Sequence, residues 1–235
     1  SWEYSVEKIF RANKDNALIE FTATCDLKDP AVESKYLDKI VFDYALAKFR
    51  ASGYTKDFQN LQSDLELWER TLGALIISEY RRNLFADCGQ NIKPVVLMKS
   101  MRIADSEAFY NQFFERLNSL SPEEIISLKS PSNIYLSTAI DYFLEKDKSL
   151  VVLVYALKLA FAKENSIIMN GSTDNTVDKQ LAVNSLEEPS NPYRIIFTVD
   201  MLNEGWDVLN LFDIVRLYET RQSGKGKIAP YTIKE

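Results

Sequence analysis

The chain has 235 residues, enough for one large domain or one and a half smaller ones. With 46% hydrophobic and 26% charged residues and no run of about eighteen apolar residues, it is typical of a soluble globular protein, not a disordered or membrane-spanning one. The net charge of -6 argues against a surface coated in positive charge, and the absence of histidine excludes His-based triads and His-containing zinc sites.

The first residues, SWEYSVEKIF, carry acidic side chains and lack the pattern of a secretory signal. We therefore expect a cytoplasmic protein whose two distant cysteines, Cys25 and Cys88, stay reduced. Residues 17–22 form a short apolar run between polar turns, which predicts a buried strand. From about residue 33 to residue 86, apolar residues recur at helical spacing and predict two helices joined near residues 52–53.

The rest of the chain alternates between strand and helix patterns. A strand is predicted at 93–100, followed by a helix that begins at Asp105 or Ser106. The stretch 121–165 is mostly helical, and its apolar end predicts a buried helix. Further predicted strands begin at residues 166, 193 and 213, with a helix after the first of them. Strands that alternate with helices indicate an α/β fold with a parallel sheet.

Ligands of parallel sheets bind beyond the carboxyl ends of the strands, where loops and helix amino ends converge. The segment FTVDMLNEGWDVLN, residues 197–210, places Asp200, Asn203, Glu204 and Asp207 at such an end. Gly205 between them permits close approach of the backbone to a ligand. The structural alternative is that Asp200 caps a helix, Gly205 ends it and the neighbouring tryptophan fills the core.

Three segments, in this order, resemble motifs III, IV and V of superfamily two helicases: TAT (22–24), KPVVLMKS (93–100) and VDMLNEGWDV (199–208). The Glu-Gly-Trp-Asp form of motif V is most similar to the ATPase (Res) subunit of type III restriction enzymes and its DEAD/DEAH-type relatives. The resemblance implies a motor of two RecA-like lobes, with ATP between them and DNA, less readily RNA, across both. The fold it implies is a RecA-like, P-loop NTPase-type parallel sheet with helices on both faces and helical insertions.

The resemblance also implies a division of the chain. Residues 1–29 would end lobe one with motif III, residues 30–91 would be a helical linker, and residues 92–235 would form lobe two with a helical insertion at about 121–165. The family's phosphate loop, G-x-x-x-x-G-K-[ST], and its Asp-Glu dipeptide occur nowhere in the sequence. We therefore expect motif II before Ser1 and motif VI after Glu235, and no ATP hydrolysis by this fragment alone. ATP and Mg²⁺ are implied for the complete protein, and the fragment alone is expected to hold neither.

Residue roles follow from the motifs. The resemblance implies no catalytic residue and no metal ligand within this chain. Coupling is implied for Thr22, Ala23 and Thr24; nucleic-acid contact for Lys99, Ser100, Gly171, Ser172, Thr173, Asp200 and Asn203; nucleotide contact for Glu204, Gly205 and Asp207. A solvated turn remains the alternative for the Gly-Ser-Thr loop, and strand-end capping for the threonines. The chain departs from many relatives at Val199, where they carry threonine, and at Cys25, where proline is common.

The complete protein is expected to act on DNA, with a methyltransferase (modification) subunit as a further partner and no membrane. Arg81 and Arg82 are weighed as a nucleic-acid surface against a solvated face with carboxylates, while Lys225 and Lys227 stay candidates in a glycine-rich loop. A nuclease is disfavoured because the one Glu-x-Lys begins at Glu33, too close to the preceding aspartates. The competing function is a non-catalytic RecA-like module that serves as a nucleic-acid- or protein-binding scaffold.

Overall fold

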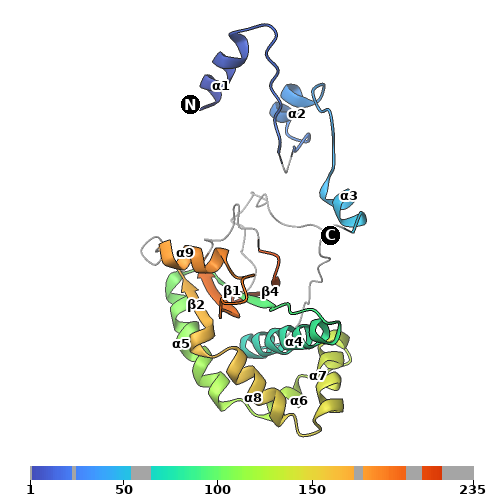
Figure 1. The fold of residues 1–235 in the computed structure, drawn as a ribbon, viewed down its shortest axis with the longest axis vertical. Coiled ribbons are helices and arrows are strands. Elements are labelled where there is room, and N and C mark those ends of the chain that lie inside the picture. Colours follow the sequence, from blue (N-terminus) through green and yellow to red (C-terminus); the bar gives the residue numbers. More distant parts are fainter. Residues whose placement is uncertain (1, 23–24, 54–64, 172–176, 200–207, 219–235) are drawn as a thin grey trace. The chain divides into compact units, whose positions relative to one another are not determined.

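A computed structural model describes residues 2–22, 25–53, 65–171, 177–199 and 208–218 (Figure 1). The chain divides into two compact units, residues 1–60 and 61–235. The helices are α1 (Trp2–Arg11), α2 (Pro30–Tyr36), α3 (Leu46–Ala51), α4 (Leu67–Asp87), α5 (Ile103–Ser119), α6 (Pro122–Ser127), α7 (Ile134–Lys146), α8 (Val151–Ala160) and α9 (Val177–Asn184). The strands are β1 (Val95–Ser100), β2 (Ser166–Met169), β3 (Ile195–Val199) and β4 (Leu211–Arg216).

The first unit is helical in its described part. Asp29 caps α2 by accepting a hydrogen bond of 2.8 Å from the backbone N–H of Ala31, and Pro30 occupies the first turn. The buried strand predicted at residues 17–22 is wrong, because these residues are irregular and Phe21 is 94% exposed. A strand needs a hydrogen-bonded neighbour, and the described residues of this unit contain no other strand that could pair with it.

The second unit is built on a parallel sheet with the strand order β2-β3-β1-β4. Strand β1 lies between β3 and β4, with Met98 opposite both Phe197 and Val215. The strands are rich in β-branched and other apolar residues, as strands covered on both faces require. Together with the surrounding helices they form an α/β, RecA-like arrangement, which confirms the predicted fold class.

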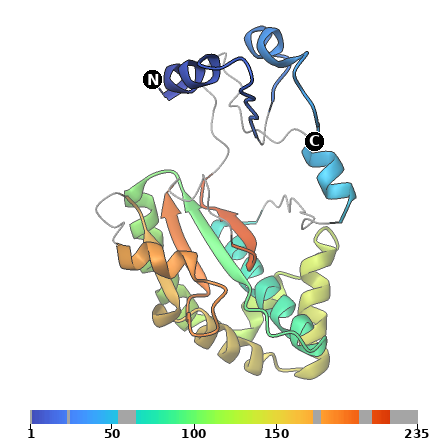
Figure 2. The same cartoon turned by 45° about the horizontal axis from the view of Figure 1, so that its top comes forward.

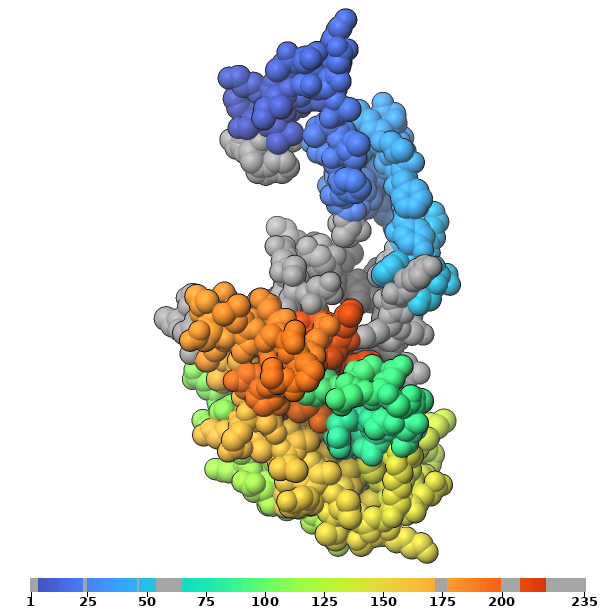
Figure 3. Space-filling view, in the orientation of Figure 1, coloured from blue at the N-terminus to red at the C-terminus, as the bar shows by residue number. Residues whose placement is uncertain are grey.

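Helices cover both faces of this sheet (Figure 2). Side chains of α4, α5, α7 and α8 form the larger core with one face, where the Phe113 and Phe197 rings lie 5.3 Å apart. Val183 of α9 packs on the other face with Leu97 and Ile196. Figure 3 shows α9, in orange, at the surface of the unit. The sheet is therefore the middle layer of three.

Helix α4 packs in the larger core, with Leu75 and Ile76 fully buried and contacts to β1, β4 and α7. Helix α4 falls within residues 30–91, for which the resemblance predicts a helical linker. The stretch 121–165 is helical as predicted, since it contains α6, α7 and α8. The division of the chain into the end of lobe one, linker and lobe two stays a prediction.

Three local expectations were wrong. The helical pattern at 33–86 was predicted to give two helices, but it contains α2, α3 and α4. Helix α5 begins at Ile103, so Arg102 is its N-cap residue instead of Asp105 or Ser106. Helix α8 is buried on one face only, and Val152 and Tyr155 on its outer face are 67% and 68% exposed. Within the described residues, no helix combines the length and apolar character that crossing a membrane requires.

Candidate functional site

The carboxyl ends of the four strands lie at one edge of the sheet, because all strand pairs are parallel. Lys99 and Ser100 end β1, and Gly171 follows β2 with one residue between. Strand β3 lies between these two strands, and its last residue, Val199, is opposite Ser100. The fold therefore brings three of the predicted nucleic-acid-contacting residues to the same edge.

Helix α5 begins at this edge, directly after β1. Within the described residues its amino end is uncapped, because Arg102 at the N-cap position makes no side-chain capping bond. The first backbone N–H groups of a helix have no partner within the helix, and they carry a partial positive charge. A helix amino end of this kind binds anions such as phosphate. Arg102 is itself exposed, so its cationic side chain adds to this potential.

Gly171 lies against the start of α5. A Cβ atom at this position would be 3.3 Å from Cδ1 of Ile103, closer than most contacts of that kind. Glycine therefore lets the turn after β2 approach the first turn of α5. The Gly171 backbone therefore lies beside the Ile103 side chain of the first turn of α5.

Cationic side chains lie on the opposite face of the same edge. Lys99 is paired in register with Arg216 of β4, so both residues belong to the face that α9 covers. Lys99 is half-buried and Arg216 is exposed. Two neighbouring cations raise the local positive potential, although the chain as a whole is acidic.

The structure does not place the other predicted site residues at this edge. Thr22 belongs to the first unit and is exposed. Nine residues lie outside the described part of the chain: Ala23, Thr24, Ser172, Thr173, Asp200, Asn203, Glu204, Gly205 and Asp207. In the described ranges, no three Asp, Glu, Cys or His side chains gather as they do around a metal ion. The predicted nucleotide and coupling contacts therefore stay predictions.

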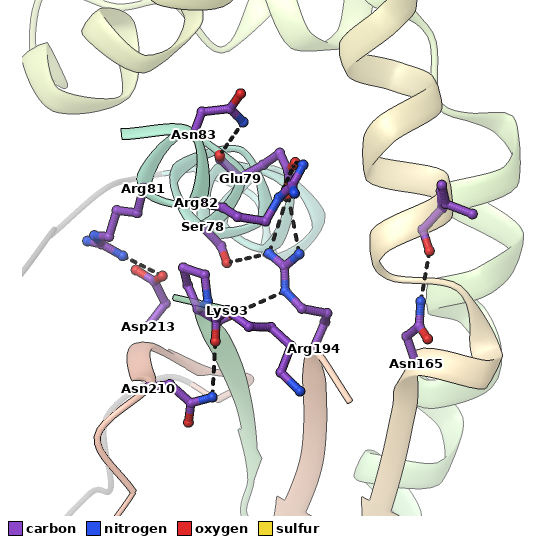
Figure 4. Close-up of polar contacts among 12 residues, drawn as sticks. Ser78, Glu79, Arg81, Arg82, Asn83, Lys93, Asn165, Arg194, Asn210 and Asp213 are labelled. Atoms are coloured by element: carbon purple, nitrogen blue, oxygen red, sulfur yellow. Dashed lines mark hydrogen bonds and ion pairs between the residues drawn. The ribbon is translucent and has the colours of Figure 1, made fainter. Parts of the chain in front are cut away.

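The most deeply buried charges lie at the opposite, amino edge of the sheet (Figure 4). Arg194, which precedes β3, donates to the backbone oxygen of Pro94 at 2.8 Å and forms an ion pair of 3.3 Å with Glu79 of α4. Burial lowers the pKa of Arg194, and the negative charge of Glu79 opposes that shift. Lys93 and Asn210, which precede β1 and β4, also donate to backbone oxygens there. These partners indicate a structural role.

Arg81 and Arg82 of α4 also form ion pairs with carboxylates. Arg81 pairs with Asp213 of β4, and Arg82 pairs with Glu79 one helical turn away. The interpretation of these arginines as groups that sit among carboxylates therefore fits the structure. Lys225 and Lys227, the other basic candidates, lie outside the described residues.

Sequence reasoning missed the uncapped start of α5. It looked for a capping side chain and chose Asp105 or Ser106, about one turn too late. The signal was the absence of Ser, Thr, Asp or Asn between the end of β1 and the helical pattern, where Arg102 stands instead. The buried Asn170 beside Gly171 was not predicted either, and an Asn-Gly pair, which is common in turns, gives no sign of burial.

No family model and no solved structure matches the chain. The chain is similar to the "Probable type III restriction-modification enzyme HindVIP Res subunit" of Haemophilus influenzae, with 35% identity over 247 residues. The alignment covers 95% of this chain and 48% of that protein, so the chain spans about half the length of the relative. The chain is thus a Res-like, helicase-related sequence, as its motifs III, IV and V indicated.

Proposed function

We propose that the chain is part of an ATP-dependent DNA helicase or translocase of the type III restriction kind. Its 35% identity to a Res subunit supports this function, and so does the order of its motifs. Residues 92–235 would form lobe two, residues 1–29 the end of lobe one and residues 30–91 the linker. This chain would help to couple ATP hydrolysis to movement along DNA. By itself it would not hydrolyse ATP.

The observation that carries the proposal is the uncapped amino end of α5 at the carboxyl edge of the sheet. A DNA phosphate there would accept hydrogen bonds from backbone N–H groups of the first turn and lie near Ser100, Arg102 and Gly171. Lys99 would add charge from the neighbouring face. Such contacts go to the DNA backbone and read no base, which is what a motor that moves along any sequence requires. The further contacts would come from Ser172, Thr173, Asp200 and Asn203.

ATP and Mg²⁺ would be bound by the complete protein, with Glu204, Gly205 and Asp207 on the nucleotide and Thr22, Ala23 and Thr24 in the coupling path. Magnesium would neutralise charge on the transferring phosphate. Two further expectations belong to the same proposal: a modification (methyltransferase) subunit as partner, and a cytoplasmic location.

The test uses the complete protein. We would measure ATP hydrolysis with and without duplex DNA, and DNA affinity by fluorescence anisotropy at several salt concentrations. Stimulation by DNA is expected for the wild type. Lys99→Ala and Arg102→Ala should each weaken DNA binding and reduce the slope of log K against log salt concentration by about one, as the loss of one phosphate contact does. Lys129→Ala, which removes an ion pair with Asp141 on the helical side, is the matched control and should leave the slope unchanged.

The experiment also tests the competing function. If the protein binds DNA but hydrolyses no ATP, it is a RecA-like binding scaffold, and the proposed motor function is wrong. If the salt slope is the same in Lys99→Ala, Arg102→Ala and the control, the proposed phosphate site at the carboxyl edge is wrong.

A further inference from the structure

Three polar side chains near the carboxyl edge are buried without a hydrogen-bond partner in the part of the chain that the structure describes. Ser100, Ser106 and Asn170 are 1%, 0% and 2% exposed. The hydroxyls of both serines and both amide atoms of Asn170 find no partner among the described residues. Buried polar groups in folded proteins are almost always paired with protein or with ordered water, so unmet groups at neighbouring positions require a reason.

Ser100 and Asn170 belong to one face of the sheet. Ser100 is in register with Val199, and Met169 is in register with Thr198, so Asn170 follows on in the same row. Residues in one row of a parallel sheet point to the same side. Met98 and Phe197 lie two residues before Ser100 and Val199 on the same strands, so they point to the same side of the sheet. Both belong to the larger core. Ser100 and Asn170 therefore face the layer that contains α5.

Ser106 lies on the buried face of α5, one turn before Phe109. The Phe109 ring is 6.3 Å from that of Phe197, which places this face over β3. One turn before Ser106, Ile103 reaches the Gly171 position. Ser106 thus lies over the carboxyl end of β3, the strand that separates Ser100 from Asn170. The three side chains therefore all face the layer between the carboxyl edge of the sheet and the first turns of α5.

The chemistry of this cluster selects its ligand. Two hydroxyls and one amide offer donors and acceptors but no charge, so the cluster suits a neutral group that both donates and accepts. Water has this property and typically makes about three hydrogen bonds when buried. It would link β1, the turn after β2 and α5, which are the three elements whose ends form the proposed DNA-phosphate site.

We propose that Ser100, Ser106 and Asn170 bind an ordered water, and that Asn170 and Ser106 are positioning residues for nucleic-acid binding. The water holds the Gly171 turn and the amino end of α5 in the relative arrangement that a phosphate needs. Asn170 and Ser106 touch no DNA. This inference rests on the proposed function, because it concerns the same edge of the sheet.

The test compares Asn170→Leu, Ser106→Ala and the double variant in the complete protein, with DNA affinity measured by anisotropy over a range of salt concentrations. Each single variant should raise the Kd for duplex DNA about threefold to tenfold, as the loss of one water-mediated hydrogen bond does. The salt slope should stay that of the wild type, because no charge is removed. The double variant should be no more than about twofold weaker than the worse single variant, since both changes remove the same water.

The control is Asn210→Leu. Asn210 is also a buried asparagine, but it lies at the amino edge and donates to the backbone oxygens of Lys93 and Leu186. The Asn210→Leu variant should have a lower thermal unfolding midpoint, while the Kd of the folded protein for DNA stays at the wild-type value. Ser106→Ala keeps the test available if Asn170→Leu does not fold.

Two sets of outcomes are separable. A wild type that binds no DNA overturns the proposed function and this inference with it. If the wild type binds, the inference alone is overturned by an unchanged Kd in both single variants, by effects that multiply in the double variant, or by a salt slope that falls by about one, which would indicate direct phosphate contact.

Discussion

Replacing Glu79 by glutamine should lower the free energy of unfolding of the second unit by about 3 kcal/mol, the lower end of the range for breaking a buried ion pair. The Glu79 and Arg194 side chains are 1% and 7% exposed, and their charged atoms lie 3.3 Å apart. Glutamine keeps the shape of the side chain and removes only the charge. Arg194 would then stay buried with cationic Arg82 nearby and no carboxylate opposite it.

The magnitude follows from what Arg194 loses and what it keeps. It loses the carboxylate that accepts two charge-assisted hydrogen bonds, of 3.3 and 3.4 Å, from its terminal nitrogens. A hydrogen bond to a charged group contributes about 1.5–3 kcal/mol, and these two are long, so the lower figure applies to each. It keeps the bond of 2.8 Å to the Pro94 backbone oxygen, which holds the cost near the bottom of the range.

Urea unfolding followed by tryptophan fluorescence would measure this cost, since Trp68 of α4 is 8% exposed in the folded state. Arg82→Gln is the matched control, because it removes the other partner of Glu79 from a side chain that is 48% exposed, and it should cost about 1 kcal/mol or less. The double change Glu79→Leu with Arg194→Met should recover most of the loss, because no charge is then left buried. A Glu79→Gln cost no larger than that of the control would refute the reasoning.

Phe197→Ala should destabilise the second unit by about 3–5 kcal/mol in the same assay, because the ring is fully buried among other aromatic rings, and a cost below about 1 kcal/mol would contradict its place in the core. Gly73→Val should cost about 1–3 kcal/mol, since even a Cβ atom at this position of α4 would lie 3.2 Å from the Leu136 side chain of α7. Burial and the charge of Arg194 lower the pKa of Lys93, so the unfolded chain binds more protons than the folded chain just below the ordinary lysine range. The stability of the wild type relative to Lys93→Met should therefore rise as the pH rises toward the ordinary lysine range, and a flat or falling difference in urea midpoints would contradict this sign.

The sequence could predict the local pattern of the second unit. Apolar runs of strand length located β1, β2 and β3 to within a few residues, because a strand covered on both faces must be apolar along its length, and a shorter apolar pattern located the edge strand β4. The alternation of these strands with amphipathic helices sufficed to predict a parallel α/β sheet. The order of the motifs sufficed to predict the similarity to a Res subunit. Lys99, Ser100 and Gly171 could be chosen because the resemblance to helicase motif IV, and to the later Gly-Ser-Thr loop, implied them.

Two local predictions failed because the deciding interaction is not local. Residues 17–22 have the composition of a buried strand, but composition cannot supply a neighbouring strand to pair with. Helix α8 is apolar on almost every face, yet only its packing decides that Leu153 and Leu157 are buried while Tyr155 is exposed.

Residue types and their spacing by themselves determined the fold class, the family resemblance and the candidate residues at the strand ends. Only the tertiary structure decided that Glu79 of α4 forms an ion pair with Arg194, which precedes β3 and lies 115 positions away, and that Ser106 lies over the row of Ser100 and Asn170. Spacing reports which face of one element is apolar, because side-chain direction repeats along the chain. Which elements meet depends on the register and packing of segments distant in sequence, and there the buried polar groups find their partners or remain unmet.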